Sequence, residues 1–289
     1  MSAAALSPRS LDAAVAALAA DPNLVPIAGC TDLMVVDPLR RLAMERVLDL
    51  TRIPELAGIR EVEGAVEIGA ATTFRAIGDS PLLRSLFPAL AEAARVVGGW
   101  QIQNRATLGG NVANASPAGD SLPVLLALDA ALVLAGPAGT RTLAYGEFHR
   151  GYRKTALAPG EIVARVRLPR PAPGTVQAFR KVGTREAQSI SKVVVALAAR
   201  VEGGGIADLR LAAGSVAPVP VRLRAAEEAA AGRPLGTETA ERVAAAAAGE
   251  VAPIDDVRST ADYRRFALGR VVRRMLLDIG AAGAAGGAA

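Results

Sequence analysis

Cysteine and histidine are almost missing from this chain, which holds one of each, Cys30 and His149. A lone cysteine excludes an intramolecular disulfide and fits a reducing compartment. An iron–sulfur cluster needs about four thiolates, and a structural zinc site needs a similar set of Cys and His ligands, so the chain supports neither by itself. His149 lies between Phe148 and Arg150 with no nucleophile motif nearby. A Ser-His-acid hydrolase is therefore disfavoured.

Aromatic residues are also scarce, at 3% of the chain, and charge of one sign is not concentrated. Lys and Arg number 33 against 28 Asp and Glu, a net charge of +5 that is spread along the sequence. No basic run is interleaved with aromatics, which disfavours nucleic-acid binding. Long apolar runs are missing too, and the N-terminus lacks the pattern of a signal peptide. We therefore expect no membrane span and a cytoplasmic location.

What the chain does have is enough apolar sequence for two domains: 289 residues, of which 51% are hydrophobic. The segment 169–174 carries three prolines and is the best linker candidate. We expect one domain over 1–170 and a second over 175–280. Residues 281–289 are Ala and Gly alone, which predicts a disordered tail.

Periodicity predicts helices and strands on both sides of this linker. Apolar and polar residues alternate over 59–70 around Glu63-Gly64, which indicates a hairpin. Helical patterns cover 10–21, with Ser10 as the N-terminal cap, and, with a break at Pro81, 72–97. Between 98 and 120 all periodicity is lost, as in an ordered functional loop. Strands at 177–182, 192–201 and 206–212, followed by helices at 224–230, 238–248 and 261–279, predict an α+β domain with an antiparallel sheet backed by helices.

Two glycine-bearing loops are the candidates for chemistry. The first is 28–33, Ala-Gly-Cys-Thr-Asp-Leu, directly after a predicted strand. The second begins at Thr107-Leu108-Gly109-Gly110-Asn111 and runs to Asp120. Glycine lets a backbone approach a ligand closely, so that successive N–H groups converge on an anion. Each loop alone could equally be a simple turn, and neither matches the phosphate-binding loop or the Gly-x-Gly-x-x-Gly fingerprint.

The two loops together resemble those of the flavin subunits of molybdenum hydroxylases, the xanthine dehydrogenase and carbon monoxide dehydrogenase class. Loop 28–33 is similar to their Ala-Gly-Gly-Thr-Asp-Leu motif, with Cys30 in place of the second glycine. Segment 107–120 is similar to Thr-Ile-Gly-Gly-Asn-x-Ala-x-Ala-Ser-Pro-x-x-Asp. The likeness continues through 161–163, 179–185, 191–193 and 214–218, and so covers nearly the whole chain.

The resemblance implies a fold and an FAD site. The fold is an α+β, two-lobed FAD-binding domain of the vanillyl-alcohol-oxidase (PCMH) type, with lobes of about 1–54 and 55–170, followed by the C-terminal α+β domain. The two loops would hold the diphosphate, Asp120 would contact the flavin nucleotide, and Lys181 would match a lysine near the flavin. The residues implied to bind FAD are Ile27, Ala28, Gly29, Cys30, Thr31, Asp32, Leu33, Val97, Thr107, Gly109, Gly110, Asn111, Asp120, Val163 and Lys181; no catalytic or metal-binding residue is implied.

The resemblance also implies partners. A large subunit would hold molybdopterin and a small subunit would hold [2Fe–2S] clusters, in a heterotrimer or its dimer. Electrons would pass from the clusters to FAD in this chain and leave to NAD or another acceptor. Two other functions stay open: a scaffold or assembly subunit that works without FAD, and a stand-alone flavin reductase.

Several single residues keep two interpretations. Asp120 could be a helix cap, and Lys181 a solvated strand lysine. We expect Cys30 to be a tolerated small residue rather than a reactive thiol, and Trp100 to pack in the core. The C-terminal arginines, Arg264, Arg265, Arg270, Arg273 and Arg274, form either a solvated helix face or a docking face.

Overall fold

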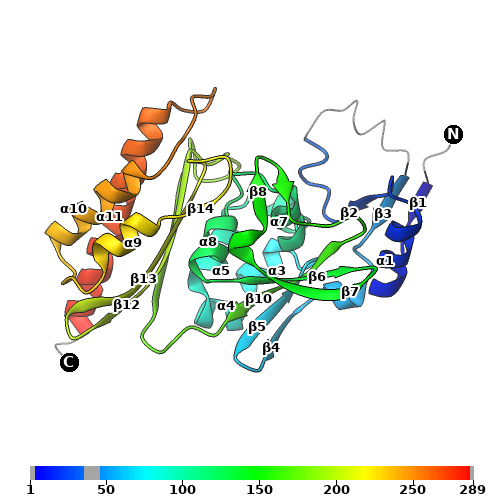
Figure 1. Ribbon diagram of the computed structural model, residues 1–289, viewed down its shortest axis with the longest axis horizontal. Coiled ribbons are helices and arrows are strands. Elements are labelled where there is room, and N and C mark those ends of the chain that lie inside the picture. The colour runs from blue at the N-terminus through cyan, green and yellow to red at the C-terminus, as the bar shows by residue number, and fades with distance from the viewer. Residues whose placement is uncertain (1–3, 36–45, 287–289) are drawn as a thin grey trace.

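The computed structural model describes residues 4–35 and 46–286. Its elements form layers that follow one another along the long axis of the molecule (Figure 1). A layer of C-terminal helices covers one face of a four-stranded sheet, and a group of short helices covers the other face. A five-stranded sheet follows, and a small N-terminal sheet lies at the end of the stack.

The N-terminal sheet is parallel, with the order β1 (Ala4–Leu6), β3 (Arg46–Asp49), β2 (Val25–Ile27). Helix α1 (Leu11–Ala20) connects β1 to β2. The predicted cap is confirmed, because the Ser10 side chain accepts from the Ala13 amide and satisfies one of the free donors at the helix start. The 3-10 turn η1 (Pro54–Leu56) leads into the next sheet.

The five-stranded sheet is antiparallel, with the order β4-β5-β10-β6-β7. The predicted hairpin is confirmed: β4 and β5 are joined through Gly64, whose φ of +67° suits glycine. Two further strands, β8 and β9, form a separate hairpin after the 3-10 turn η2. The bounds are β4 (Ile59–Val62), β5 (Ala65–Gly69), β6 (Ala131–Gly136), β7 (Gly139–Ala144), η2 (Tyr145–Glu147), β8 (His149–Gly151), β9 (Lys154–Thr155) and β10 (Ile162–Pro169).

Six short helices lie between the two larger sheets. The segment 72–97 breaks at Pro81, as predicted, and also at Pro88, because proline has no N–H to continue a helix. The segment 98–120 is not one irregular loop, and that prediction is wrong: it contains α6 and α7, which are too short to show periodicity. The bounds are α3 (Phe74–Asp79), α4 (Pro81–Leu86), α5 (Pro88–Arg95), α6 (Trp100–Gln103), α7 (Leu108–Asn114) and α8 (Leu122–Ala127).

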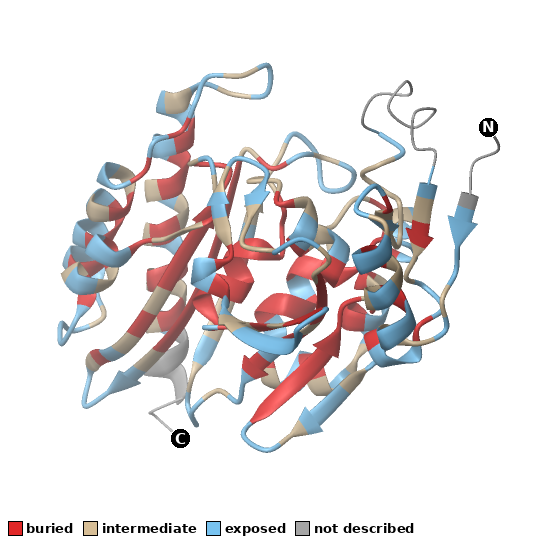
Figure 2. Ribbon diagram, turned by 45° about the vertical axis from the view of Figure 1, so that its right-hand side comes forward, coloured by how far each residue is buried: buried red, intermediate tan, exposed pale blue. Residues whose placement is uncertain are grey.

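The C-terminal sheet is antiparallel, with the order β11 (Val176–Val182), β12 (Val193–Glu202), β13 (Gly205–Gly214), β14 (Val221–Arg222). Alternate residues of β12 point to opposite faces. Val193, Val195 and Leu197 pack with the C-terminal helices, whereas Val194 and Ala196 belong to the core of the first domain. Both faces of this sheet are therefore buried, which joins the two predicted domains (Figure 2).

The C-terminal helices are α9 (Arg224–Ala230), α10 (Thr237–Gly249) and α11 (Ala261–Gly286). Helix α11 continues to Gly286, so much of the segment 281–289 that the sequence predicts to be disordered is helical. Ser215, which follows β13, is a turn residue with φ of +64°. Within residues 4–35 and 46–286, no helix is both long and apolar enough to cross a membrane. The α+β class with an antiparallel C-terminal sheet and helices is confirmed.

Candidate functional site

The first glycine loop follows β2 and is shaped by two residues. A Cβ on Gly29 would lie 2.0 Å from the Arg105 carbonyl oxygen, so only glycine fits there. Cys30 has φ of +59°, in the left-handed region that favours glycine, which is the residue common in the resembling family. No amide from residue 29 to 33 donates to another of the described residues. With respect to residues 4–35 and 46–286, these N–H groups are therefore available to an anion.

The second loop is the start of helix α7. The Thr107 side chain caps the helix and accepts from the Gly110 amide at 3.2 Å. A Cβ on Gly109 would lie 2.4 Å from that of Ala70, so this glycine is required by packing. A Cβ on Gly110 would meet only Thr107 Oγ1, at 2.8 Å. Gly110 therefore faces the open side of the loop.

Most amides at the start of α7 already have acceptors inside the protein. Leu108 donates to Thr72 O at 3.0 Å, Gly109 to Ala70 O at 2.8 Å and Asn111 to Thr107 O at 3.0 Å. These three amides are therefore already bound within the protein, and the binding of FAD by the backbone and side chains of this segment stays a prediction. Gly110 is the exception, because its N–H is bound only to a side-chain hydroxyl, which can rotate away.

The two loops, far apart in sequence, meet in space. The packing of Gly29 on the Arg105 carbonyl brings the first loop against the residues just before Thr107. At the other end, Asp32 lies 3.6 Å from Arg153, which also donates to Asn114 at the end of α7. One ligand can therefore contact both loops.

A buried polar cluster centred on Asp120 lies beside this region. Asp120 is 7% exposed, and its two oxygens accept from Lys181 Nζ at 2.6 Å and from Ser191 Oγ at 2.5 Å. Lys181 also donates to the Val96 carbonyl at 2.9 Å, next to the half-buried Val97. Asp120 belongs to the first domain and Lys181 and Ser191 to the second, so the cluster connects the two.

These contacts decide two open interpretations. Asp120 is not a helix cap, because both of its oxygens are used by Lys181 and Ser191. Lys181 is not solvated, because its side chain is 8% exposed. Burial raises the pKa of Asp120, while the Lys181 charge and the two hydrogen bonds act in the opposite direction.

The remaining predicted residues surround this region. Asn111 accepts from Ser121 Oγ at 2.8 Å, which ties the segment after Asp120 to α7. Val163 is buried on β10, in the same core as the Leu108 side chain of α7. Ile27 ends β2, and Ala28, Thr31 and Leu33 are half-buried in the first loop.

Three single-residue expectations have outcomes. Burial raises the pKa of the Cys30 thiol, which supports its interpretation as an unreactive residue. Trp100 does not pack in the core: it is 67% exposed, with the Arg75 guanidinium 4.3 Å from the ring centre. Arg264 does not belong to a solvated face, because it is 4% exposed and donates to the Lys192 and Ser215 carbonyls.

Sequence reasoning missed Ser191 and Arg153. Ser191 was part of a matched segment, but nothing in its neighbours indicates a bond to Asp120, 71 residues away. Arg153 lies in a short basic stretch, Arg150-Gly151-Tyr152-Arg153-Lys154, which was the only available signal.

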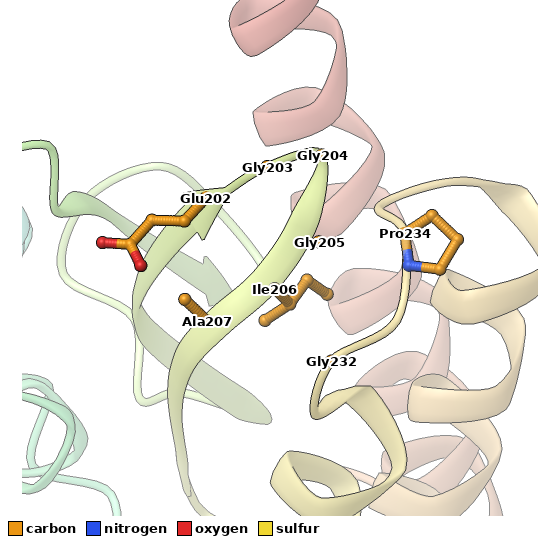
Figure 3. Close-up of a pocket in the computed structure, with 8 residues that line it drawn as sticks. All are labelled: Glu202, Gly203, Gly204, Gly205, Ile206, Ala207, Gly232 and Pro234. Carbon is orange, nitrogen blue, oxygen red and sulfur yellow. The ribbon is translucent and has the colours of Figure 1, made fainter.

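A surface depression at the far end of the C-terminal sheet is a poor alternative site (Figure 3). It lies at the β12–β13 turn, between Gly203 and Pro234, and its one charged lining residue is the acidic Glu202. Such a lining does not suit an anionic nucleotide. Strand β12 also separates it from the Asp120 cluster by about 30 Å, from the rise of about 3.3 Å per strand residue.

Two family models match the chain. Residues 1–171 match the FAD binding domain in molybdopterin dehydrogenase. Residues 177–279 match the CO dehydrogenase flavoprotein C-terminal domain.

Curated relatives are similar over nearly their full length. The carbon monoxide dehydrogenase medium chain of Hydrogenophaga pseudoflava is 34% identical, over 93% of this chain and 94% of the relative. The xanthine dehydrogenase FAD-binding subunit of Escherichia coli O157:H7 is 32% identical, over 95% and 94%. Among solved structures, carbon monoxide dehydrogenase from Hydrogenophaga pseudoflava gives a TM-score of 0.91, over 95% of this chain and 96% of that chain, at 34% identity.

Proposed function

The chain belongs to the family of FAD-binding subunits of molybdopterin dehydrogenases, and from that premise we propose that it passes electrons from the [2Fe–2S] clusters of a partner subunit, through its FAD, to NAD or another acceptor. FAD is its cofactor, and the chain is a flavoprotein subunit of an oxidoreductase. The observation that carries the proposal is the similarity to the CO dehydrogenase medium chain across both domains.

The residues present fit FAD. The first loop offers amides 29–33, which have no acceptor among the described residues, and Gly110 leaves the second loop open on one side. We propose that the diphosphate lies between these loops. We propose that the flavin end lies toward Val97, Asp120 and Lys181, and that Ile27, Ala28, Thr107, Asn111 and Val163 complete the site. FAD supplies the transfer of electrons, and the chain supplies binding, orientation and electrostatics.

The single cysteine indicates that any iron–sulfur cluster in the electron path belongs to a partner subunit. Iron–sulfur clusters are held by about four thiolates each, and this chain has only Cys30. Within residues 4–35 and 46–286, no group of three or more His, Cys, Asp or Glu side chains could hold a metal ion. From the similarity to the carbon monoxide dehydrogenase medium chain, we propose a small subunit with [2Fe–2S] clusters and a large subunit with molybdopterin, in a heterotrimer or its dimer. The lone cysteine is compatible with the cytoplasmic location that we also propose.

Electron flow through this chain can be tested in the assembled complex. The chain would be co-expressed with the large and small subunits, once as wild type and once as Gly110→Val, and both complexes would be reduced photochemically without oxygen. After NAD is added, we expect the cluster absorbance of the wild-type complex to recover as NADH forms. The flavin-free variant should keep its clusters reduced. Equal recovery in both complexes would contradict the proposal.

The choice of acceptor and the reductase alternative have separate readouts. If NAD gives no reoxidation, the same experiment with a quinone or a dye identifies another acceptor class. A stand-alone flavin reductase would reduce dye with NADH as the isolated chain. We expect the isolated chain to take up FAD but to lack sustained turnover without its partners.

A further inference from the structure

The β8–β9 hairpin reaches from the five-stranded sheet to the two glycine loops. Its base is fixed, because Phe148 is fully buried and the Ala156 amide donates to the Phe148 carbonyl at 2.8 Å. Its tip carries Tyr152 and Arg153, both exposed. Figure 1 shows β8 beside α7. A rigidly held hairpin can therefore place one side chain at the junction of the loops.

Arg153 is that side chain. Its Nη1 donates to Asn114 Oδ1 at 3.2 Å and lies 3.6 Å from Asp32 Oδ2. Asp32 belongs to the first loop, and Asn114 is the last residue of α7, whose start is the second loop. One guanidinium thus contacts both elements of the candidate site. Its planar set of donors can serve two acceptors at once, which an ammonium does less well.

We propose that Arg153 is a positioning residue that holds the first glycine loop against α7 and so sets the spacing of the two loops around the FAD diphosphate. This inference rests on the proposal that the diphosphate lies between them. The backbone of Arg153 has φ of +52°, a conformation uncommon for residues other than glycine. The hairpin turn thus has an arginine at a position whose backbone conformation is more favourable for glycine or asparagine.

The contact itself contributes little to folding. The Arg153 and Asp32 side chains are 39% and 43% exposed, and ion pairs this exposed to water add little to stability. Replacing Arg153 should therefore leave the chain folded. Its effect should be seen in FAD binding, because loose loops must be ordered when the ligand binds.

The test is FAD titration of the full-length apo chain, followed by the quenching of flavin fluorescence. The variants are Arg153→Gln, Asp32→Ala and the double variant. Arg150→Gln is the matched control, since Arg150 is exposed on the same hairpin and has no ion pair with another described residue. We expect each single variant to weaken FAD binding about fivefold and the double variant to weaken it no further, because both remove the same contact. The control should bind as wild type, and all melting temperatures should agree.

Three results would overturn the inference. One is wild-type FAD affinity in Arg153→Gln. Another is additive losses in the double variant, which would mean that the two residues act separately. The third is tighter binding by Asp32→Ala, which would mean that Arg153 contacts the phosphate directly and that Asp32 competes for it. A wild-type chain that binds no FAD would instead overturn the proposed FAD site as a whole.

Discussion

Replacing Lys181 with methionine should test the buried cluster that connects the two domains. In the wild type, the Asp120 carboxylate is 7% exposed and accepts from Lys181 Nζ at 2.6 Å and Ser191 Oγ at 2.5 Å. Methionine keeps much of the side-chain length but removes the charge and the donor. Asp120 would then be buried with one hydrogen bond and no counter-charge.

The expected loss is large. Removing one partner of a buried pair typically costs about 3–5 kcal/mol, and the Ser191 bond that remains places this case near 3 kcal/mol. The loss should depend on pH. The pKa of Asp120 is already raised by burial, and it rises further once Lys181 is gone. A carboxyl with a raised folded-state pKa stabilises the protein at low pH and loses that contribution as pH rises. The variant should therefore be closest to wild type near pH 4 and weakest at pH 7.

The assay is urea unfolding of the full-length chain between pH 4 and pH 8, with the free energy of unfolding compared at each pH. Lys154→Met is the control, because Lys154 is exposed on β9. The double variant Asp120→Asn with Lys181→Met removes both charges and should regain most of the lost stability. A Lys181→Met loss below about 1 kcal/mol that does not vary with pH would refute the reasoning.

Three other substitutions give independent checks. Thr107→Ala removes the cap on the Gly110 amide and should lower the free energy of unfolding by about 1 kcal/mol in urea titrations without FAD; no change would contradict the cap. Burial lowers the pKa of His149 to about 4, so the protein should lose stability as pH falls from about 6.5 to 4. In urea titrations across this range, His149→Gln should remove up to about 3 kcal/mol of that loss, and an unchanged loss in the variant would contradict this role of His149. Cys30→Val should lower the melting temperature and Cys30→Gly should not, because φ there is +59° and a β-branched residue is strained at positive φ.

Local sequence signals predicted much of the fold. The Ser10 cap, the Gly64 hairpin and the long alternating strands of the C-terminal sheet are set by near neighbours, and each is present. Strands β1, β7, β8, β9 and β14 were not predicted; four of them are only two or three residues long and depend on distant partners. Helix α7 was missed because Gly109-Gly110 has low helix propensity, although its Thr107 cap was visible in the sequence.

The sequence predicted which residues belong to the candidate site better than it predicted how they are arranged and bonded. The glycine loops and Asp120 were found by their motif, but their hydrogen bonds were not. Amides of α7 that could have bound an anion donate to carbonyl groups of this chain instead, as the Gly109 amide does to Ala70, which packs against it. The bond from Ser191 to Asp120 and the Arg153 bridge join residues on different elements, so no local pattern could predict them.

The central claim is that FAD binds where the two glycine loops meet, and the most direct measurement is flavin content after purification. Wild-type chain and Gly110→Val would be produced with their partner subunits, and bound FAD per chain would be measured by absorbance after denaturation. A Cβ at Gly110 meets only Thr107 Oγ1, so valine should fold there while its methyl groups occupy the open side of the loop. We expect nearly one FAD per wild-type chain and almost none in a folded Gly110→Val. Equal flavin content in the two proteins would contradict the claim.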